Sequence, residues 1–408
     1  MTGEPSSVVI VGGGLAGAKT AEAVRSNGFS GPVTLIAAES ELPYERPPLS
    51  KSYLLGKDSF EKAVVHPAEW YADNQIDLRL GRIATSIDRD SQVVTLDDGD
   101  RVGYGALVLA TGSEPRNLAV PGSDATGVLM LRTRADSDAI RDTFGDGRSL
   151  VIIGAGWIGL EVAAAAREAG TSVAVIESAE LPLLAALGSD IAPVFADLHR
   201  AHGVDLRLNA GVAEILVADG RAVGVRLSDG SEIAADAVLV GIGARPRTSL
   251  AETAGLDVDN GVLVDASLRT SDAAIFAVGD IANHDHPLLK RRVRVEHWAA
   301  ALNQPKAAAA ALLGGDAEYA ELPYFFSDQY DLGMEYVGLA DASARLVTRG
   351  DVAAREFVAF WLDDSNRLLA AMNVNVWDVP DAVKPLIKAG TVVDPDRLAD
   401  PSVDLASL

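Results

Sequence analysis

Two glycine-rich segments carry the clearest chemistry in this chain. Residues 12–17 read GGGLAG and residues 154–159 read GAGWIG, so both have the GxGxxG spacing. In this spacing the first glycine permits a tight turn, the second lets the backbone approach a pyrophosphate, and the third allows close helix–strand packing. These glycines are Gly12, Gly14 and Gly17 in the first copy and Gly154, Gly156 and Gly159 in the second. Helix N-terminal amides can then meet the phosphate charge, so the pattern predicts two dinucleotide sites.

An acidic residue follows each glycine segment by about twenty residues, at the end of a strand-like run. These residues are Glu39 and Glu177. A carboxylate at this position can hold the ribose hydroxyls of an adenine nucleotide. Glu177 favours NADH, because it would repel a 2′-phosphate and because Ser178 and Ala179 supply no arginine. The alternative for either residue is a solvated glutamate at a strand end.

The strands and helices around the glycines must place them at the end of a sheet. Both halves of the chain have the same order of elements for this purpose: a strand, the glycine segment, a helix and a second strand. Strand-like residues 8–11, a helical stretch to about residue 27 and a strand at 33–37 surround the first segment. Residues 150–153, another helix and a strand at 172–176 surround the second. Each half then continues with an Asp-Gly hairpin and a buried closing strand, at 106–109 and 237–240.

The sequence therefore predicts an α/β protein with two Rossmann-like dinucleotide-binding domains. Residues 1–113 and 243–318 are expected to form one nucleotide-binding domain, which is discontinuous, and residues 114–242 are expected to form the other. Residues 319–408 do not repeat either unit. Their alternating runs and one helical stretch, at 379–388, predict a small α+β domain.

Composition narrows the class of protein. The net charge of −23 argues against nucleic-acid binding, because phosphate contacts require lysine and arginine. No apolar run reaches membrane-spanning length, and the first strand begins too early to leave room for a signal peptide. We therefore expect a cytoplasmic protein that uses neither nucleic acid nor a membrane.

Several further segments carry a family resemblance. Residues 43–51 (PYERPPLSK), 110–112 (ATG), 277–280 (AVGD) and 322–330 (LPYFFSDQY) resemble segments of the FAD-dependent pyridine nucleotide reductases. Within them the chain looks like the ferredoxin reductase branch, and the resemblance covers essentially the whole chain. It implies a glutathione-reductase-like plan with FAD and NADH as cofactors, in which residues 1–113 and 243–318 form the FAD-binding domain and residues 114–242 the NAD-binding domain. Residues 319–408 would contribute to the flavin environment and to the docking of the partner, a [2Fe–2S] ferredoxin. That ferredoxin would feed a cytochrome P450 or a ring-hydroxylating oxygenase.

The resemblance also assigns roles to residues. It places Arg46 and Pro48 against FAD, Lys51 near the isoalloxazine ring, Asp280 at the ribityl hydroxyls and Glu161 near the nicotinamide. Lys51 and Glu161 would be the catalytic pair. The remaining cofactor-binding residues that it implies are Ala110, Thr111, Gly112, Arg116, Gly279, Glu296, His297, Trp298 and Phe326. Phe326 stands where relatives commonly have tryptophan, which puts fine partner specificity in doubt.

Simpler interpretations exist for several of these residues. Arg46 and Lys51 could be ordinary surface charges in a proline-rich turn. His297 and Trp298 could serve packing alone, and Glu161 could be favoured by the helix dipole. His284 and His286 have a metal-like spacing, but beside Pro287 we expect them to be solvated on a loop, and we predict no metal site.

The chain contains no cysteine. Disulfide reductases and flavin peroxidases of the same plan pass electrons through a thiol, so that route is closed here. Electrons must then leave the flavin directly for a docked one-electron acceptor. The alternatives are a reductase of a small acceptor, such as a quinone or monodehydroascorbate, and a non-enzymatic redox sensor of the apoptosis-inducing-factor type.

Docking of an acidic ferredoxin on an acidic protein requires a local positive field. The densest basic run comprises Lys290, Arg291, Arg292 and Arg294, and Lys306 follows shortly after it. We expect this region to border the docking face.

Overall fold

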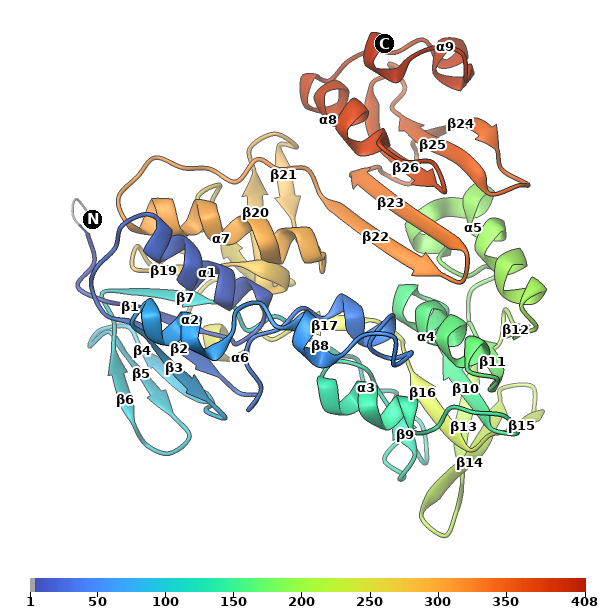
Figure 1. The fold of residues 1–408 in the computed structure, drawn as a ribbon, viewed down its shortest axis with the longest axis horizontal. Coiled ribbons are helices and arrows are strands. Elements are labelled where there is room, and N and C mark those ends of the chain that lie inside the picture. The colour runs from blue at the N-terminus through green and yellow to red at the C-terminus, as the bar shows by residue number, and fades with distance from the viewer. Residues whose placement is uncertain (1–3) are drawn as a thin grey trace. The chain divides into compact units, whose positions relative to one another are not determined.

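The computed structural model describes residues 4–408, which divide into two compact units (Figure 1). Unit 1 comprises the described residues up to Arg46 together with Phe60–Glu114 and Arg245–Pro323. Unit 2 comprises Pro47–Ser59, Pro115–Ala244 and Tyr324–Leu408. The division into three domains at residues 113/114, 242/243 and 318/319 stays a prediction, and its residues 1–3 lie outside the described part.

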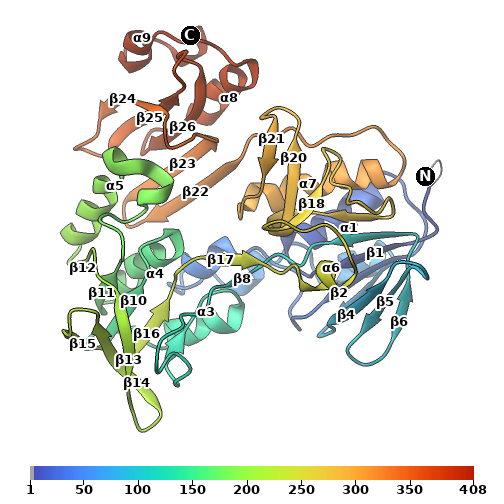
Figure 2. The same ribbon diagram turned by 180° about the vertical axis from the view of Figure 1, so that it is seen from behind.

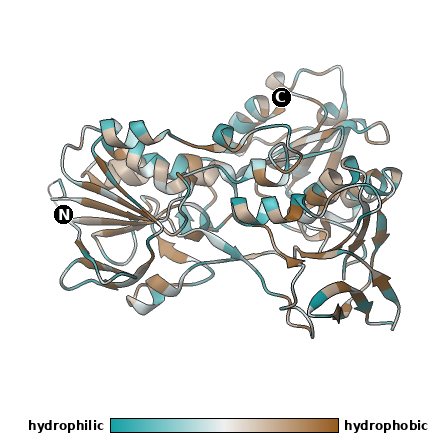
Figure 3. Cartoon of the chain, turned by 60° about the horizontal axis from the view of Figure 1, so that its bottom comes forward, coloured by the Kyte–Doolittle hydropathy of each residue, from teal (hydrophilic) through white to brown (hydrophobic). Residues whose placement is uncertain are grey.

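Unit 1 is built on a parallel sheet. Its strand order is β19 (Ile275–Ala277), β7 (Ala106–Leu109), β1 (Val8–Val11), β2 (Val33–Ala37) and β3 (Ile76–Leu80). The residues of β1, β2 and β7 are all buried, as continuous apolar runs in a parallel sheet must be when both faces are covered. Figure 3 shows brown, hydrophobic strands in this sheet.

Two helices and a meander cover the two faces of this sheet. Helices α1 (Leu15–Ser26) and α7 (Trp298–Leu312) lie side by side above the sheet in Figure 1. The antiparallel strands β4 (Ala84–Asp88), β5 (Val93–Leu96) and β6 (Arg101–Gly103) lie below it. All three layers contribute to one hydrophobic core cluster.

Short elements complete unit 1, and Figure 2 shows several of them from behind. They are η2 (Phe60–Ala63), α2 (Ala68–Asp73), α6 (Ser249–Thr253), η3 (Gly279–Ile281) and the small sheet of β18 (Val262–Val264), β20 (Ala282–His286) and β21 (Arg291–Val293). The strands β8 (Ser113–Pro115) and β17 (Ala244–Pro246) contain the unit boundaries at which the chain leaves unit 1 after Glu114 and returns to it at Arg245.

The first half of unit 2 repeats the architecture of unit 1. Its parallel sheet has the order β12 (Asp205–Arg207), β11 (Ser172–Ile176), β10 (Ser149–Ile153), β16 (Ala237–Val240) and β9 (Val128–Leu129). Around it lie η1 (Pro47–Ser50), α3 (Arg134–Arg141), α4 (Trp157–Glu168), α5 (Leu184–Ala201) and the meander β13 (Val212–Ala218), β14 (Arg221–Leu227) and β15 (Glu232–Ala234). Helix α5 has a break at Gly188, where the backbone is non-helical.

The second half of unit 2 is an antiparallel sheet. Its order is β22 (Tyr324–Gln329), β23 (Leu332–Gly338), β26 (Leu368–Val374), β25 (Glu356–Leu362) and β24 (Arg345–Asp351). The chain ends with α8 (Val379–Ala389), α9 (Pro395–Ala399) and η4 (Leu405–Ser407). Residues of this sheet share one core cluster with α4, α5 and β10, so both halves of unit 2 pack as one body. The predicted α/β fold with a C-terminal α+β region is confirmed.

The expectation that His284 and His286 are solvated loop residues is wrong. Both lie on β20 and are at most 2% exposed. His286 uses both ring nitrogens: Nε2 lies 3.0 Å from the Glu321 carbonyl oxygen, and Nδ1 accepts from the amides of Leu288 and Leu289. The local sequence concealed this, because the strand pairs with distant β18.

Burial of these rings predicts acid sensitivity of unit 1. Burial lowers the pKa of His284 to about 4, and the neighbouring His286 ring adds to the effect. An unfolded histidine titrates near 6.5, so between about pH 6.5 and pH 4 the unfolded chain binds more protons and stability falls as the pH falls. At pH 5 we expect His284 to cost about 2 kcal/mol.

The variant His284→Asn tests this expectation, since its amide can still donate to the Val293 carbonyl oxygen that His284 contacts. We expect the fall in melting temperature between pH 7 and pH 5 to be smaller in this variant than in the parent. An unchanged pH dependence would exclude His284 as a source of the acid sensitivity.

Candidate functional site

The first glycine loop joins β1 to α1 in unit 1 and is closely packed on one side. Gly12 has φ +128°, and a Cβ there would run into the Ala110 carbonyl. The predicted segment Ala110–Thr111–Gly112 therefore lies against this loop. A Cβ at Gly14 would meet nothing within 4 Å, so the middle glycine faces open space. This is the approach that a pyrophosphate requires.

The second predicted flavin motif adjoins the same loop. Gly279 and Asp280 form η3, and a Cβ at Gly279 would lie 3.1 Å from the Ala16 Cβ at the start of α1. The Gly279 amide donates to the buried Gln304 side chain at 2.7 Å. Asp280 is thus brought to the end of the sheet where the glycine loop lies.

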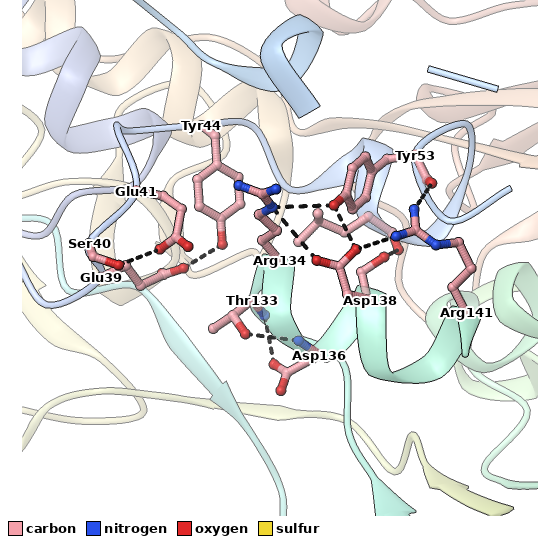
Figure 4. A network of polar contacts seen from close by, with 12 residues as sticks. Glu39, Ser40, Glu41, Tyr44, Tyr53, Thr133, Arg134, Asp136, Asp138 and Arg141 are labelled. Carbon is pink, nitrogen blue, oxygen red and sulfur yellow. Dashed lines mark hydrogen bonds and ion pairs between the residues drawn. The ribbon is translucent and has the colours of Figure 1, made fainter. Parts of the chain in front are cut away.

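Glu39 does not stand alone at the end of β2. It accepts from the Tyr44 hydroxyl at 2.5 Å and pairs with the Arg46 guanidinium at 2.9 Å. Figure 4 shows the bond between Tyr44 and Glu39. Burial acts to lower the pKa of Arg46, but Tyr44 and Glu39 raise it above its ordinary value. Arg46 is therefore a paired charge of the site. An isolated β-bridge between the backbones of Tyr44 and Gly14 holds this cluster beside the glycine loop.

These features fit the adenine dinucleotide part of FAD. Gly14, the N-cap residue of helix α1, has no side chain to cap it, so the first amides of the helix are not engaged by a capping side chain. Open space at Gly14, a carboxylate at the strand end and an uncapped helix N-terminus are the three elements that bind such a ligand.

The second glycine loop, in unit 2, has the same construction. Gly154 has φ +104° and its Cβ would run into the Gly241 carbonyl, whereas a Cβ at Gly156 would meet nothing within 4 Å. Helix α4 also begins without a side-chain cap. Glu177 accepts from the Ala155 amide at 2.7 Å and from the Ala179 amide at 2.9 Å. Its carboxylate is thereby held beside the loop, as a ribose ligand must be.

Lys51 and Glu161 meet directly in unit 2. The Lys51 Nζ lies 2.7 Å from Glu161 Oε2, and the side chains are 16% and 3% exposed. Glu161 also accepts from the hydroxyls of Ser50 at 2.5 Å and Ser327 at 2.7 Å. The Lys51 Nζ is 5.4 Å from the centroid of the Phe326 ring. A buried carboxylate requires such partners, so Glu161 is more than a residue favoured by the helix dipole.

The segment that carries Lys51 is anchored on α3, as Figure 4 shows. The Tyr53 hydroxyl donates to Asp138 at 2.7 Å, and Arg141 donates to the same carboxylate at 2.7 Å. Ser137 donates to the Leu49 carbonyl at 2.8 Å. The Pro48 carbonyl accepts from the Lys51 amide, which closes the turn.

Other predicted residues are placed as follows. Trp298 donates to Glu45 at 2.8 Å, and Glu296 pairs with Arg294 at 2.8 Å. His297 precedes α7, and burial lowers its pKa to about 4. Thr111 donates to the Arg247 carbonyl, while Arg116 donates to the Ala244 carbonyl. The cofactor roles of all these residues stay predictions.

Comparison with known proteins identifies the family. Residues 6–305 match the model of the pyridine nucleotide-disulphide oxidoreductases, and residues 324–408 match a reductase C-terminal model. The chain belongs to this oxidoreductase family. Among the residues that the structure describes, no helix is long and apolar enough to cross a bilayer.

Relatives within the family include proteins named as ferredoxin reductases. The chain is 45% identical to the ferredoxin–NAD(+) reductase component of an anthranilate 1,2-dioxygenase system from Burkholderia cepacia, over 97% of this chain and 98% of the relative. It is 41% identical to rhodocoxin reductase of Rhodococcus erythropolis, over 98% and 93%. The reductase in a covalent putidaredoxin reductase–putidaredoxin complex superposes with a TM-score of 0.95 at 38% identity, over 98% and 97%. The predicted ferredoxin reductase branch is confirmed.

Some residues of the site escaped the sequence analysis. Tyr44, Ser50, Ser327 and Gln329 lie within segments that resemble the family, but nothing in the local pattern marks them as partners of Glu39 or Glu161. His199 gave no signal at all, because it lies 130 residues from Gln329, its partner.

The buried pair predicts a coupled response to mutation. Lys51→Met and Glu161→Gln should each lower stability by about 3 kcal/mol or more, because each leaves the other charge buried and unpaired. The double variant should lose less than the sum of the two single losses. Melting temperatures of the four proteins measure this coupling, and strictly additive losses would show that the two groups do not interact.

Proposed function

We propose that this protein is an NADH-dependent ferredoxin reductase that serves an oxygenase or a cytochrome P450. Bound FAD would take a hydride from NADH and release the electrons one at a time to a [2Fe–2S] ferredoxin. The observation that carries the proposal is a disulphide-oxidoreductase plan without any cysteine, since no thiol can accept electrons from the flavin. Relatives of nearly equal length that are named as ferredoxin reductases support it.

The residues of the chain have distinct tasks in this function. The loop at Gly14, the Glu39–Tyr44–Arg46 cluster and Asp280 would hold FAD. The loop at Gly156 and Glu177 would hold NADH, and no arginine follows Glu177 to favour a 2′-phosphate. Lys51, fixed by Glu161, would supply a positive charge that stabilises the electron-rich reduced flavin.

The docking face for ferredoxin stays a proposal on the β20–β21 hairpin and α7. Two of the expected basic residues have tasks inside the fold: Arg292 donates to the carbonyls of Val264 and Asn283, and Arg294 donates to the Asp280 carbonyl. Lys290 and Lys306, which are exposed, are therefore better candidates for contacts with an acidic partner. A cytoplasmic location also stays a prediction, which cell fractionation would test.

Reduction of cytochrome c by NADH tests the proposed reaction. We expect slow reduction by the reductase alone and strong stimulation by the cognate [2Fe–2S] ferredoxin, because the cluster accepts single electrons from the flavin. The same ferredoxin without its cluster is the control and should not stimulate. Rapid reduction of a quinone, with indifference to every ferredoxin, would instead favour a small acceptor.

Charge reversal tests the docking face. The double variant Lys290→Glu/Lys306→Glu should raise the KM for ferredoxin by about tenfold, because like charges then meet in the complex. Reduction of ferricyanide by NADH should be unchanged. Arg101→Glu on β6 is a control at an exposed position away from β21. Equal KM values in the double variant and the parent would place the docking face elsewhere.

A further inference from the structure

A line of buried polar side chains leads from Glu161 to helix α5, and the function proposed above does not require it. The Ser327 hydroxyl oxygen lies 2.7 Å from Glu161 Oε1, and Gln329 Nε2 lies 3.1 Å from that hydroxyl oxygen. Gln329 Oε1 in turn lies 2.9 Å from His199 Nε2. Ser327, Gln329 and His199 are each at most 1% exposed. Polar groups buried to this extent in the core of unit 2 demand an explanation.

Regular secondary structure brings these groups together. Phe325, Ser327 and Gln329 alternate along β22 and so share one of its faces. Trp157 and Glu161 lie one turn apart on α4 and share a face of that helix. The Trp157 and Phe325 rings are 5.1 Å apart, so strand and helix run side by side through the contact between Ser327 and Glu161. The strand then ends at Gln329, where α5 presents His199.

The carboxylate determines the direction of every hydrogen bond in the line. A carboxylate can only accept, so Ser327 must donate its single proton to Glu161. The Ser327 oxygen can then only accept from Gln329, which orients the amide with Nε2 toward Ser327 and Oε1 toward His199. His199 must therefore carry its proton on Nε2. Its Nδ1 is left to accept, and the Tyr330 hydroxyl lies 3.5 Å from it.

This line orients groups and does not carry protons. An amide cannot pass a proton along without changing its tautomer, so Gln329 blocks a relay. Burial also lowers the pKa of His199 to about 4, which keeps the ring neutral. Successive donors that point the same way polarise one another, and here all of them point at Glu161.

We propose that His199 and Gln329 are positioning residues, which hold the Ser327 hydroxyl as a donor to Glu161 and thereby fix the Lys51 ammonium for hydride transfer. The inference rests on the proposed function only for the reaction that Lys51 assists. The placement of Lys51 itself can be measured without NADH or ferredoxin.

Acetylation of Lys51 by trace acetic anhydride, quantified by peptide mass spectrometry on the purified flavoprotein, reports how firmly Glu161 holds the ammonium. Ser327→Ala should raise the acetylation rate of Lys51 by about tenfold, because one charge-assisted hydrogen bond to the carboxylate is lost. Gln329→Met should raise it by roughly threefold, because Ser327 is then less well held. In the Ser327→Ala background Gln329→Met should add nothing, since Gln329 acts through Ser327.

Replacements of His199 provide an independent test if Gln329→Met does not fold. His199→Leu removes the donor to Gln329 and should release Lys51 as Gln329→Met does. His199→Gln places an amide nitrogen near the Nε2 position and should restore the parent reactivity. His202→Gln is the matched control at the residue that follows α5, because His202 bonds the Leu198 carbonyl and stacks on Tyr330 rather than bonding Gln329.

Stopped-flow reduction of the flavin by NADH links the placement of Lys51 to the reaction. Gln329→Met should lower the limiting rate by a factor similar to its gain in Lys51 acetylation and leave the Kd for NADH unchanged. If folded Gln329→Met and His199→Leu proteins show parent-like Lys51 reactivity, or if Gln329→Met has the same effect with and without Ser327, the proposal is wrong. If the variants instead show the expected changes in Lys51 acetylation but the parent protein shows no ferredoxin-dependent turnover, the proposed function is wrong and the positioning role stands.

Discussion

Glu161 imposes the strongest electrostatic requirement in unit 2. Its carboxylate is 3% exposed, and a charge buried to this degree must be surrounded by partners. Those partners come from separate stretches of chain: Ser50 is the last residue of η1, Lys51 follows it, and Ser327 lies on β22. One helix position therefore determines where a proline-rich segment and a strand of the antiparallel sheet must lie. The anchoring of Tyr53 and Leu49 on α3 holds the Lys51 segment from its other side.

Close backbone packing shapes the two nucleotide loops in the same way in both units. In each loop the first glycine lies against the backbone carbonyl of the residue just after the closing strand, which is Ala110 in unit 1 and Gly241 in unit 2. The middle glycine faces open space. The two requirements are linked, because a loop pressed against the sheet exposes its amides on the opposite side. The helices that follow have no side-chain cap, so their N-terminal amides remain for phosphate oxygens. Pairing of Glu39 with Tyr44 and Arg46 adds a fixed charge pattern to the first loop.

The absence of cysteine limits the redox chemistry of this chain as much as the groups that it contains. Family members that reduce disulfides need thiols, and this chain has no cysteine with which to do so. Its polar core around Glu161 consists instead of hydroxyl, amide, imidazole and ammonium groups, none of which can accept electrons from a reduced flavin. The Phe326 ring adds an aromatic contact, with its centroid 5.4 Å from the Lys51 ammonium.

The sequence by itself determined the two strand–loop–helix units, the acids that follow them and the absence of a thiol route, because periodicity, glycine spacing and composition are local properties. Tertiary structure alone decided which charges are paired. Lys51 and Glu161 are 110 positions apart, and Gln329 meets His199 across 130. The burial of His284 and His286 was likewise hidden, since it comes from pairing of β20 with β18 and from the Glu321 carbonyl. Hydrogen bonds and ion pairs form between groups that folding brings together, so no local pattern can reveal them.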